Sequence, residues 1–256
     1  MEKVSGIVTC FNRENEIEQC LQSVRWVDEL IVVDSFSTDR TVERVKPYAD
    51  KFFQREYSSP GDQKNWAITR ASYSWIVVID SDEVMPEELR DEIRRTLRSP
   101  TFDCYLVYRR GIFLGKKMKH GGWNRDTNYL LFSGNRYRYT DEVHERLVPE
   151  TDYGIFENRL IHYTHRSINE FMVKSNRYAT MGALKYYRKG RRGMVTDMIF
   201  HPLFNFCKNY IFRLGCLDGA CGLISAVLSS CYVAQKHARL WELKQRTLKN
   251  KNIEDS

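Results

Sequence analysis

Residues 75–83 have the sequence Trp75-Ile76-Val77-Val78-Ile79-Asp80-Ser81-Asp82-Glu83, an apolar run that ends in acids. Five apolar residues in succession are typical of a strand that is covered on both faces of a sheet. A helix is predicted directly afterwards, because Pro86 suits a first helical turn. Ligands of open α/β sheets bind outside the carboxyl ends of the strands, so this turn is the first candidate for a functional site.

The same order of elements occurs upstream. Residues 4–9 form a strand-like run, and residues 30–33 form a second buried strand that ends at Asp34. Between them, Asn12 is the expected cap of a helix that turns Ile17 inward. Alternating strands and helices predict an α/β fold with a mainly parallel sheet and right-handed crossovers. Two strands thus end in carboxylates at what should be one edge of that sheet.

The pattern changes after residue 100. Residues 102–109 and 129–139 are rich in aromatic side chains and are predicted to be further strands, of antiparallel type. A basic, glycine-containing loop is expected over 111–122. From residue 166 to 256 the chain is predicted to be mostly helical, basic and aromatic.

Composition places the chain among ordinary globular proteins. Its 256 residues are 42% hydrophobic and 29% charged, which excludes wholesale disorder. The net charge of +7 is unevenly distributed, at −5 over residues 1–100, +8 over 101–200 and +4 over 201–256. The acidic first part and the basic remainder are therefore expected to have different roles.

The cysteines and the apolar segments limit the cellular setting. Seven cysteines without a C-x-x-C pair favour free thiols in a reducing cytoplasm over a zinc site or a disulfide framework. The N-terminus has no signal-peptide apolar core. The longest uncharged stretch, residues 219–235, is short for a membrane span and predicts a buried or membrane-surface helix.

Two nucleotide-binding motifs do not occur in the sequence. No G-x-G-x-x-G follows the first strand, and no G-x-x-x-x-G-K-[ST] occurs, which disfavours dinucleotide oxidoreductases and P-loop NTPases. Phosphate charge would then be met by a metal ion and cationic side chains. Asp80 and Asp82, at a strand end, suit a hard divalent cation that carries a nucleoside diphosphate. The alternative is a solvated turn whose acids face the start of a helix.

Six blocks of the chain occur in a characteristic order. The blocks are Thr9-Cys10-Phe11-Asn12-Arg13-Glu14, Val32-Val33-Asp34-Ser35-Phe36-Ser37-Thr38-Asp39, Gln63-Lys64-Asn65, Asp80-Ser81-Asp82, Val143-His144-Glu145 and Leu217-Asp218-Gly219. Together they resemble family 2 glycosyltransferases of GT-A fold, and more narrowly the lipopolysaccharide core enzymes that transfer β-1,4-linked glucose. The resemblance is strong over residues 1–85 and looser beyond, and the order of the blocks is more specific than any one of them.

The resemblance implies a domain division and a set of roles. Residues 1–165 would be the GT-A catalytic domain, with a nucleotide-binding half to residue 100 and an acceptor-binding half from 101. A divalent cation, Mg²⁺ or Mn²⁺, would be held at Asp82. The implied nucleotide-sugar contacts are Thr9, Glu14, Asp34, Asp39, Lys64, Asp80 and Ser81.

Three of these positions have open alternatives. Many relatives have two consecutive acids where this chain has Asp34 and Ser35. Because Ser35 offers no charged acceptor to a base N–H, the sequence leaves open whether the base of the donor nucleotide is uracil. Asp39 is equally explained as a first-turn acid that faces a helix dipole. Lys64 is equally explained as a surface lysine.

Transfer with inversion needs a carboxylate that takes the proton of the acceptor hydroxyl. The candidates lie in an acidic cluster of the basic middle third, where Glu145 ranks first because it belongs to the family-like block, ahead of Glu142 and Asp141. Each has a surface carboxylate as its alternative. His162 is a candidate for completing the metal shell, with a structural histidine as its alternative.

The basic C-terminal half suggests a partner. A run of cations over 185–192 precedes an aromatic segment over 199–212, a combination that favours an anionic membrane surface. No nucleic-acid recognition fold is visible, so no nucleic-acid partner is predicted. The alternative is a helix that packs on the protein's own core.

The resemblance therefore implies a metal-dependent inverting glycosyltransferase. The expected donor is UDP-glucose, and the expected acceptor is the lipid-linked inner-core heptose of lipopolysaccharide, met by an enzyme peripheral on the inner face of the cytoplasmic membrane. A sugar nucleotidyltransferase and a non-catalytic protein that binds anionic lipid are the alternatives.

Overall fold

The computed structural model describes residues 2–140, 147, 149 and 152–254. They form two compact units, one made of residues 1–110 and 125–163 and the other of residues 111–124 and 164–256. The second unit includes the basic loop that sequence analysis assigned to the catalytic domain.

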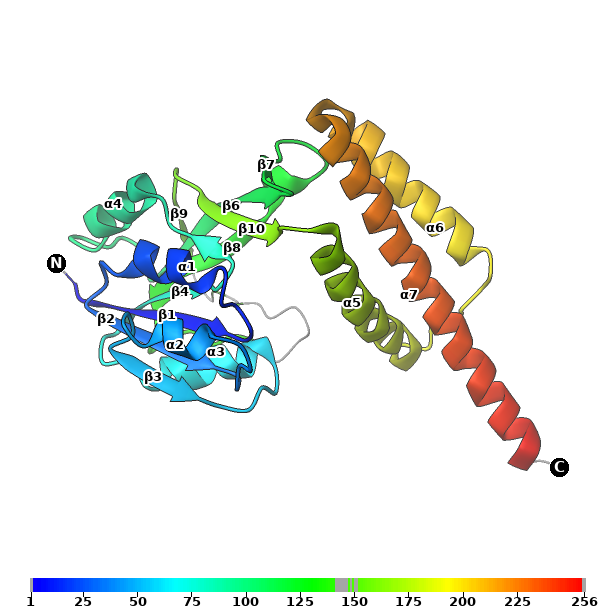
Figure 1. The fold of residues 1–256 in the computed structure, drawn as a ribbon, viewed down its shortest axis with the longest axis horizontal. Coiled ribbons are helices and arrows are strands. Elements are labelled where there is room, and N and C mark those ends of the chain that lie inside the picture. Colours follow the sequence, from blue (N-terminus) through cyan, green and yellow to red (C-terminus); the bar gives the residue numbers. More distant parts are fainter. Residues whose placement is uncertain (1, 141–146, 148, 150–151, 255–256) are drawn as a thin grey trace. The chain divides into compact units, whose positions relative to one another are not determined.

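The first unit is built on a mixed sheet (Figure 1). Its strand order is β3-β2-β1-β4-β8-β6-β10-β5, in which β1, β2, β3 and β4 are parallel and β8 runs antiparallel to both β4 and β6. The strands are β1 (Val4–Cys10), β2 (Glu29–Asp34), β3 (Lys51–Gln54), β4 (Trp75–Asp80), β5 (Glu83–Val84), β6 (Cys104–Phe113), β7 (Lys116–Lys117), β8 (Thr127–Ser133), β9 (Gly154–Ile155) and β10 (Leu160–His165). The predicted α/β fold class is confirmed.

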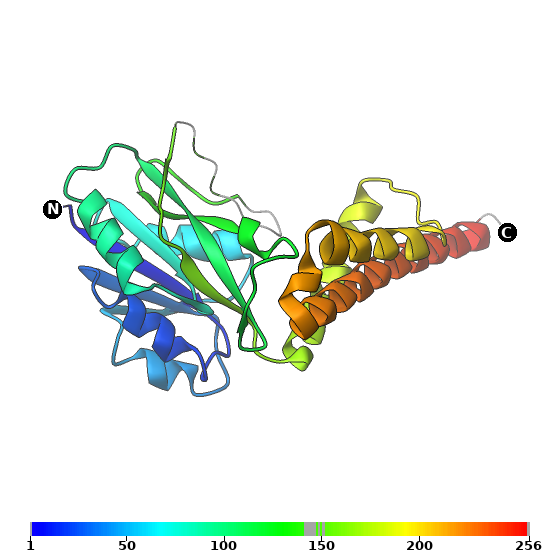
Figure 2. The same ribbon diagram turned by 90° about the horizontal axis from the view of Figure 1, so that it is seen from above.

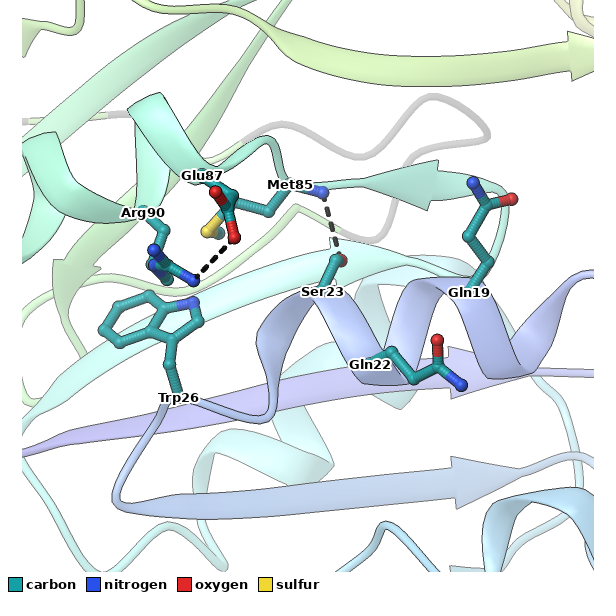
Figure 3. A pocket seen from close by; sticks show the side chains of 7 residues that line it. All are labelled: Gln19, Gln22, Ser23, Trp26, Met85, Glu87 and Arg90. Carbon is teal, nitrogen blue, oxygen red and sulfur yellow. Dashed lines mark hydrogen bonds and ion pairs between the residues drawn. The ribbon is translucent and has the colours of Figure 1, made fainter.

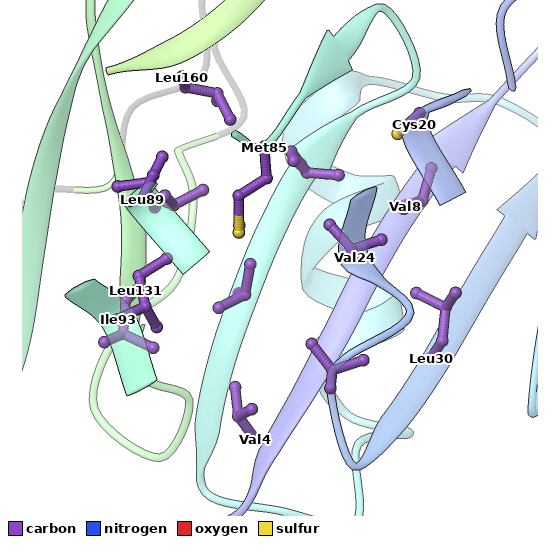
Figure 4. Close-up of a cluster of buried hydrophobic side chains, with 14 of the residues drawn as sticks. Val4, Val8, Cys20, Val24, Leu30, Met85, Leu89, Ile93, Leu131 and Leu160 are labelled. Atoms are coloured by element: carbon purple, nitrogen blue, oxygen red, sulfur yellow. The ribbon is translucent and has the colours of Figure 1, made fainter. Parts of the chain in front are cut away.

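Helices cover both faces of this sheet, as the continuous apolar runs predict. Successive side chains of a strand point to opposite faces, so Val8 joins the core beneath α1 and α4, whereas Ile7 joins the core beneath α3. Figure 4 shows the first of these cores. The helices are α1 (Ile17–Val24), α2 (Thr41–Val45), α3 (Pro60–Ile68) and α4 (Glu87–Thr96), with a short 3₁₀ turn at Trp123–Arg125.

The prediction that Asn12 caps α1 is wrong. The helix begins at Ile17, and Asn12 lies in the preceding loop with φ of +50°. Its side-chain oxygen accepts a hydrogen bond from the backbone N–H of Thr38, at 2.8 Å. Asn12 therefore joins two loops instead of capping a helix.

The second unit is helical, as predicted for the C-terminal region. Helices α5 (Ile168–Arg188) and α6 (Asp197–Phe206) pack along α7 (Gly219–Glu254), and Figure 2 shows α6 beside α7. A π-helical turn (Cys207–Phe212) and a 3₁₀ turn (Gly215–Asp218) connect α6 to α7. Among the described residues, one helical stretch, Gly215–Thr247, is long and apolar enough to cross a membrane by length and composition.

Asp218 attaches the basic loop of the second unit to the start of α7. Its buried carboxylate accepts hydrogen bonds from the backbone N–H groups of Lys119 and His120, at 3.1 and 2.8 Å. Phe113 and Met118 pack with Phe171 in the small core beside it. This contact gives the Leu217-Asp218-Gly219 block a structural role.

Glu29 joins three segments at the start of β2. Its buried carboxylate accepts hydrogen bonds from the hydroxyls of Ser5 and Ser72, at 2.8 and 2.7 Å, and pairs with the Lys51 ammonium at 2.6 Å. Burial alone would raise the pKa of Glu29, but the bonds from Lys51, Ser72 and Ser5 outweigh it and lower the pKa to about 2.

Replacing Glu29 by Gln should lower the free energy of unfolding at pH 7 by about 2 kcal/mol. Because the folded pKa of Glu29 lies below its ordinary value of 4.5, its stabilisation is present above that pH. The stabilisation is lost as the pH falls from 4.5 toward 2. Urea unfolding at pH 7 and pH 3 should therefore show a gap between wild type and Glu29→Gln that narrows at pH 3. A gap of the same size at both values would contradict this account, and exposed Glu56→Gln is the control.

Candidate active site

The carboxyl ends of three parallel strands place the predicted residues side by side. In the strand register Thr9 lies opposite Asp80, and Cys10 lies opposite Asp34. Thr9 is half-buried and Asp34 is fully buried. The edge predicted from the sequence therefore exists, with β1 between the two strands that end in acids.

The carboxylate of Asp34 accepts its hydrogen bonds from other residues of the protein. It accepts hydrogen bonds from the backbone N–H of Ser37 at 2.9 Å, from the Ser37 hydroxyl and from the side-chain amide of Gln54 at 3.1 Å. The turn that it holds includes Phe36, whose φ is +59°. Ser35 accepts a hydrogen bond from Gln63, at 2.9 Å. Asp34 thus fixes the shape of the loop after β2.

Glu14 and Asp39 hold that loop against the loop after β1. The Glu14 N–H donates to the Asp39 carboxylate at 3.2 Å, and the Arg40 N–H donates to the Glu14 carboxylate at 3.1 Å. Asp39 also accepts from the backbone N–H of Thr41, at 2.9 Å. Burial would raise the pKa of Asp39, but hydrogen bonds from the hydroxyl and the N–H of Thr41 and from the N–H of Glu14 hold it below its usual value. Both acids make contacts that stabilise the loops of this edge.

Lys64 is not a surface lysine, because its side chain is only 3% exposed. Its ammonium lies 2.8 Å from the Asp80 carboxylate and above the ring of Tyr139. Burial would raise the pKa of Asp80, but Lys64 lowers it to about 2, with smaller contributions from Arg109 and His162. Asp80 is therefore ionised at neutral pH.

Asp82 and His162 approach each other from separate elements. Ser81 is buried in the turn after β4, and Asp82 follows it. His162, on β10, places its Nε2 3.6 Å from a carboxylate oxygen of Asp82. Burial would lower the pKa of His162, but Asp126, Asp82 and Glu83 raise it.

This pair suits a divalent cation by its donor chemistry. A carboxylate oxygen and an imidazole nitrogen 3.6 Å apart can serve one ion, since metal–ligand bonds are about 2.1 Å long. An arginine, Arg13, also reaches Asp82, at 3.9 Å. The residues present therefore fit the cation that the resemblance implies.

Three residues of this edge were missed by the sequence reasoning. Arg109 of β6 pairs with Glu83 at 3.0 Å and with Asp126 at 2.7 Å. Glu83 stood in the acidic run but received no role, and an arginine within an otherwise aromatic strand was the available signal for Arg109. Asp126, just before β8, carried no local signal.

The predicted bases Glu145, Glu142 and Asp141 lie outside the described residues.

A pocket of about 340 Å³ lies elsewhere, between α1 and the segment leading into α4 (Figure 3). Trp26, Met85 and Arg90 are among its lining residues, and none of the predicted site residues is. It is therefore separate from the acidic edge.

In the second unit, Asp197, His201 and His237 form another cluster of metal-ligand types. The two imidazole rings stack nearly parallel, with centroids 4.5 Å apart and an interplanar angle of 7°. Because an imidazole lone pair lies in the plane of its ring, stacked rings do not direct their nitrogens at one ion. The cluster is thus a weaker candidate than the acidic edge.

Comparison with known proteins agrees with this geometry. A family model described as glycosyl transferase family 2 matches residues 5–146. The chain is 28% identical to the lipopolysaccharide core biosynthesis glycosyltransferase LpsC of Rhizobium meliloti, covering 92% of this chain and 93% of LpsC. It is 27% identical to an uncharacterized glycosyltransferase of Rickettsia felis, covering 99% of this chain and 93% of the relative.

The fold has a solved counterpart. The structure of S. aureus TarS 1-349 in complex with UDP is similar, with a TM-score of 0.50, 16% identity and coverage of 96% of this chain and 92% of that one. At this identity the likeness concerns the fold alone. Because the family model spans more than half of the sequence, the chain belongs to glycosyl transferase family 2.

Proposed function

We propose that the protein is an inverting glycosyltransferase that moves glucose from UDP-glucose onto the inner-core heptose of lipopolysaccharide. The observation that carries the proposal is the constellation of Asp80, Lys64, Asp82 and His162 at the carboxyl edge of the sheet. The acceptor class rests on the resemblance of the sequence blocks and on the similarity to LpsC over nearly the whole chain.

We assign different roles in donor binding to different residues of the edge. Asp82 and His162 would hold a divalent cation, Mg²⁺ or Mn²⁺, which offsets negative charge on the departing diphosphate. Thr9 and the turn at Ser81 would line the donor site. Asp34, Glu14 and Asp39 would act mainly by fixing the two loops that face the nucleoside.

Lys64 and Asp80 would act as a pair. Lys64 keeps Asp80 ionised, and Asp80 keeps a buried ammonium at the donor site, where it can attract the diphosphate. Glu145 is the proposed base, with Glu142 and Asp141 as the other candidates, and it takes the proton of the acceptor hydroxyl as the glycosidic bond forms.

The second unit would dock the enzyme on an anionic membrane. Helix α6 packs along α7 but exposes four large apolar side chains, Ile199, Phe200, Leu203 and Phe204, each by 58–66%. Phe212 and Leu217, in the turns between α6 and α7, are exposed as well. Exposed cations precede it in the chain, at Lys185, Arg188, Lys189, Arg191 and Arg192. This combination favours an interfacial helix at the cytoplasmic leaflet, where the proposed lipid-linked acceptor would be presented.

Asp82→Asn should lower the rate of glucose transfer by more than about 100-fold, because a neutral amide is a poor ligand for a divalent cation. The measurement is UDP release from UDP-glucose with Mn²⁺ or Mg²⁺ and a lipopolysaccharide core acceptor. Asp91→Asn, in an exposed ion pair on α4, is the matched control. Wild-type rates in Asp82→Asn would refute the proposed cation site.

Glu145→Gln should abolish transfer while UDP-glucose still binds, since the amide cannot accept the hydroxyl proton. General-base catalysis typically contributes a factor of about 10² to 10⁴. Donor binding is checked by the thermal shift that UDP-glucose produces, because a ligand of the folded state raises its stability. Unchanged turnover would remove Glu145 from the role and direct the same test to Glu142 and Asp141.

The double variant Phe200→Ser, Phe204→Ser should lose binding to vesicles that contain anionic lipid, measured by flotation at low salt. Wild type should float with anionic vesicles and much less with neutral ones, since each nearby Lys or Arg contributes about 1 kcal/mol of attraction. Ile155→Ser, at an apolar residue of the first unit that is 55% exposed, is the control and should float like wild type. Absence of wild-type association would overturn the docking proposal.

A further inference from the structure

Arg109 stands between two carboxylates of the acidic edge. Its side chain is 18% exposed, with one terminal nitrogen 3.0 Å from Glu83 and the other 2.7 Å from Asp126. Burial alone would lower the pKa of Arg109, but the two carboxylates raise it, so the guanidinium stays charged. The planar guanidinium fixes the direction of both contacts.

Each carboxylate reaches one side of the proposed cation site. The second oxygen of Glu83 accepts a hydrogen bond from the backbone N–H of Asp80, at 2.9 Å, where the turn to Asp82 begins. The second oxygen of Asp126 lies 3.5 Å from Nδ1 of His162. The other ring nitrogen of His162 is the one that faces Asp82. Arg109 is thus linked to the positions of both candidate ligands without contacting Asp82.

The contact between Asp126 and His162 has a chemical consequence. Nδ1 of His162 is buried and makes no hydrogen bond with the described residues, and the Asp126 carboxylate is the acid that faces it at 3.5 Å. A carboxylate in this position favours the tautomer with its proton on Nδ1, which leaves the lone pair on Nε2, and such outer partners orient the rings of metal-ligating histidines. Mg²⁺ prefers oxygen ligands and retained waters, whereas Mn²⁺ accepts an imidazole nitrogen more readily. An oriented His162 therefore favours Mn²⁺ over Mg²⁺.

Resting on the proposed function, we propose that Arg109 and Asp126 are positioning residues that hold His162 as a nitrogen ligand and so select Mn²⁺ over Mg²⁺. Arg109 fixes Asp126, and Asp126 fixes the His162 ring. Glu83, held by the other end of the same guanidinium, keeps the turn of Asp80 and Asp82 in register with it.

The test compares the affinities of the full-length protein for Mn²⁺ and for Mg²⁺ in the presence of UDP, by calorimetry. In Asp126→Asn the Mn²⁺ affinity should fall about 10- to 100-fold, as for other outer partners of metal ligands. The Mg²⁺ affinity should change much less, because the carboxylate ligand remains. The ratio of the two affinities is the decisive readout, since a general structural defect would lower both together.

Three further variants complete the design. His162→Ala should show the same loss of Mn²⁺ preference, and adding Asp126→Asn to it should cause no further loss, because both act through one ring. Arg109→Gln should give the same change in the ratio, and Asp126→Asn keeps the test decisive if loss of Arg109 prevents folding. Arg110→Gln, the next residue of β6 and on the other face of the strand, is the matched control.

An unchanged ratio in folded Asp126→Asn would overturn the inference. If the wild-type protein with UDP binds neither Mn²⁺ nor Mg²⁺, the cation part of the proposed function fails, and the inference fails with it. Binding of both ions by wild type, with Asp126→Asn indistinguishable from it, would refute the inference alone.

Discussion

Negative charge gathered at the end of β4 costs electrostatic free energy, and much of the first unit is arranged to offset that cost. Asp80, Asp82 and Glu83 follow one another closely, and Asp126 adds a fourth carboxylate from before β8. Water alone cannot screen them, because Glu83 is fully buried and Asp80 is in contact with a buried ammonium. Lys64 and Arg109 supply the opposing charge from two different elements, α3 and β6.

This balance makes the edge both rigid and suited to a ligand. Each cation contacts at least one carboxylate, so the acids keep defined positions before any donor arrives. The loops beside them are fixed separately, through Asp34, Glu14 and Asp39, whose carboxylates bind backbone N–H groups. A donor would therefore meet a preorganised surface, in which Nε2 of His162 lies 3.6 Å from a carboxylate oxygen of Asp82.

The second unit differs from the first in the kind of surface that it presents. In place of buried charge it has exposed apolar area, concentrated on α6 and on the turns that follow it. Large apolar patches on soluble proteins usually mark a surface that is covered by a partner. Cations near the patch in sequence favour an anionic lipid surface over a neutral one. The proposed docking on a membrane rests on these two attractions.

Local patterns determined the α/β fold, the positions of β1, β2 and β4, the helical C-terminal region and the acids at the strand ends. These features could be predicted because burial on two faces and helix periodicity appear as patterns among residues that are close together in the chain. Tertiary structure alone decided how the charges pair. Arg109 meets Glu83 and Asp126 across 26 and 17 residues of chain, and Asp34 accepts hydrogen bonds from Ser37 and Gln54. Such choices depend on which strands become neighbours in the sheet, and no short stretch of sequence records that order.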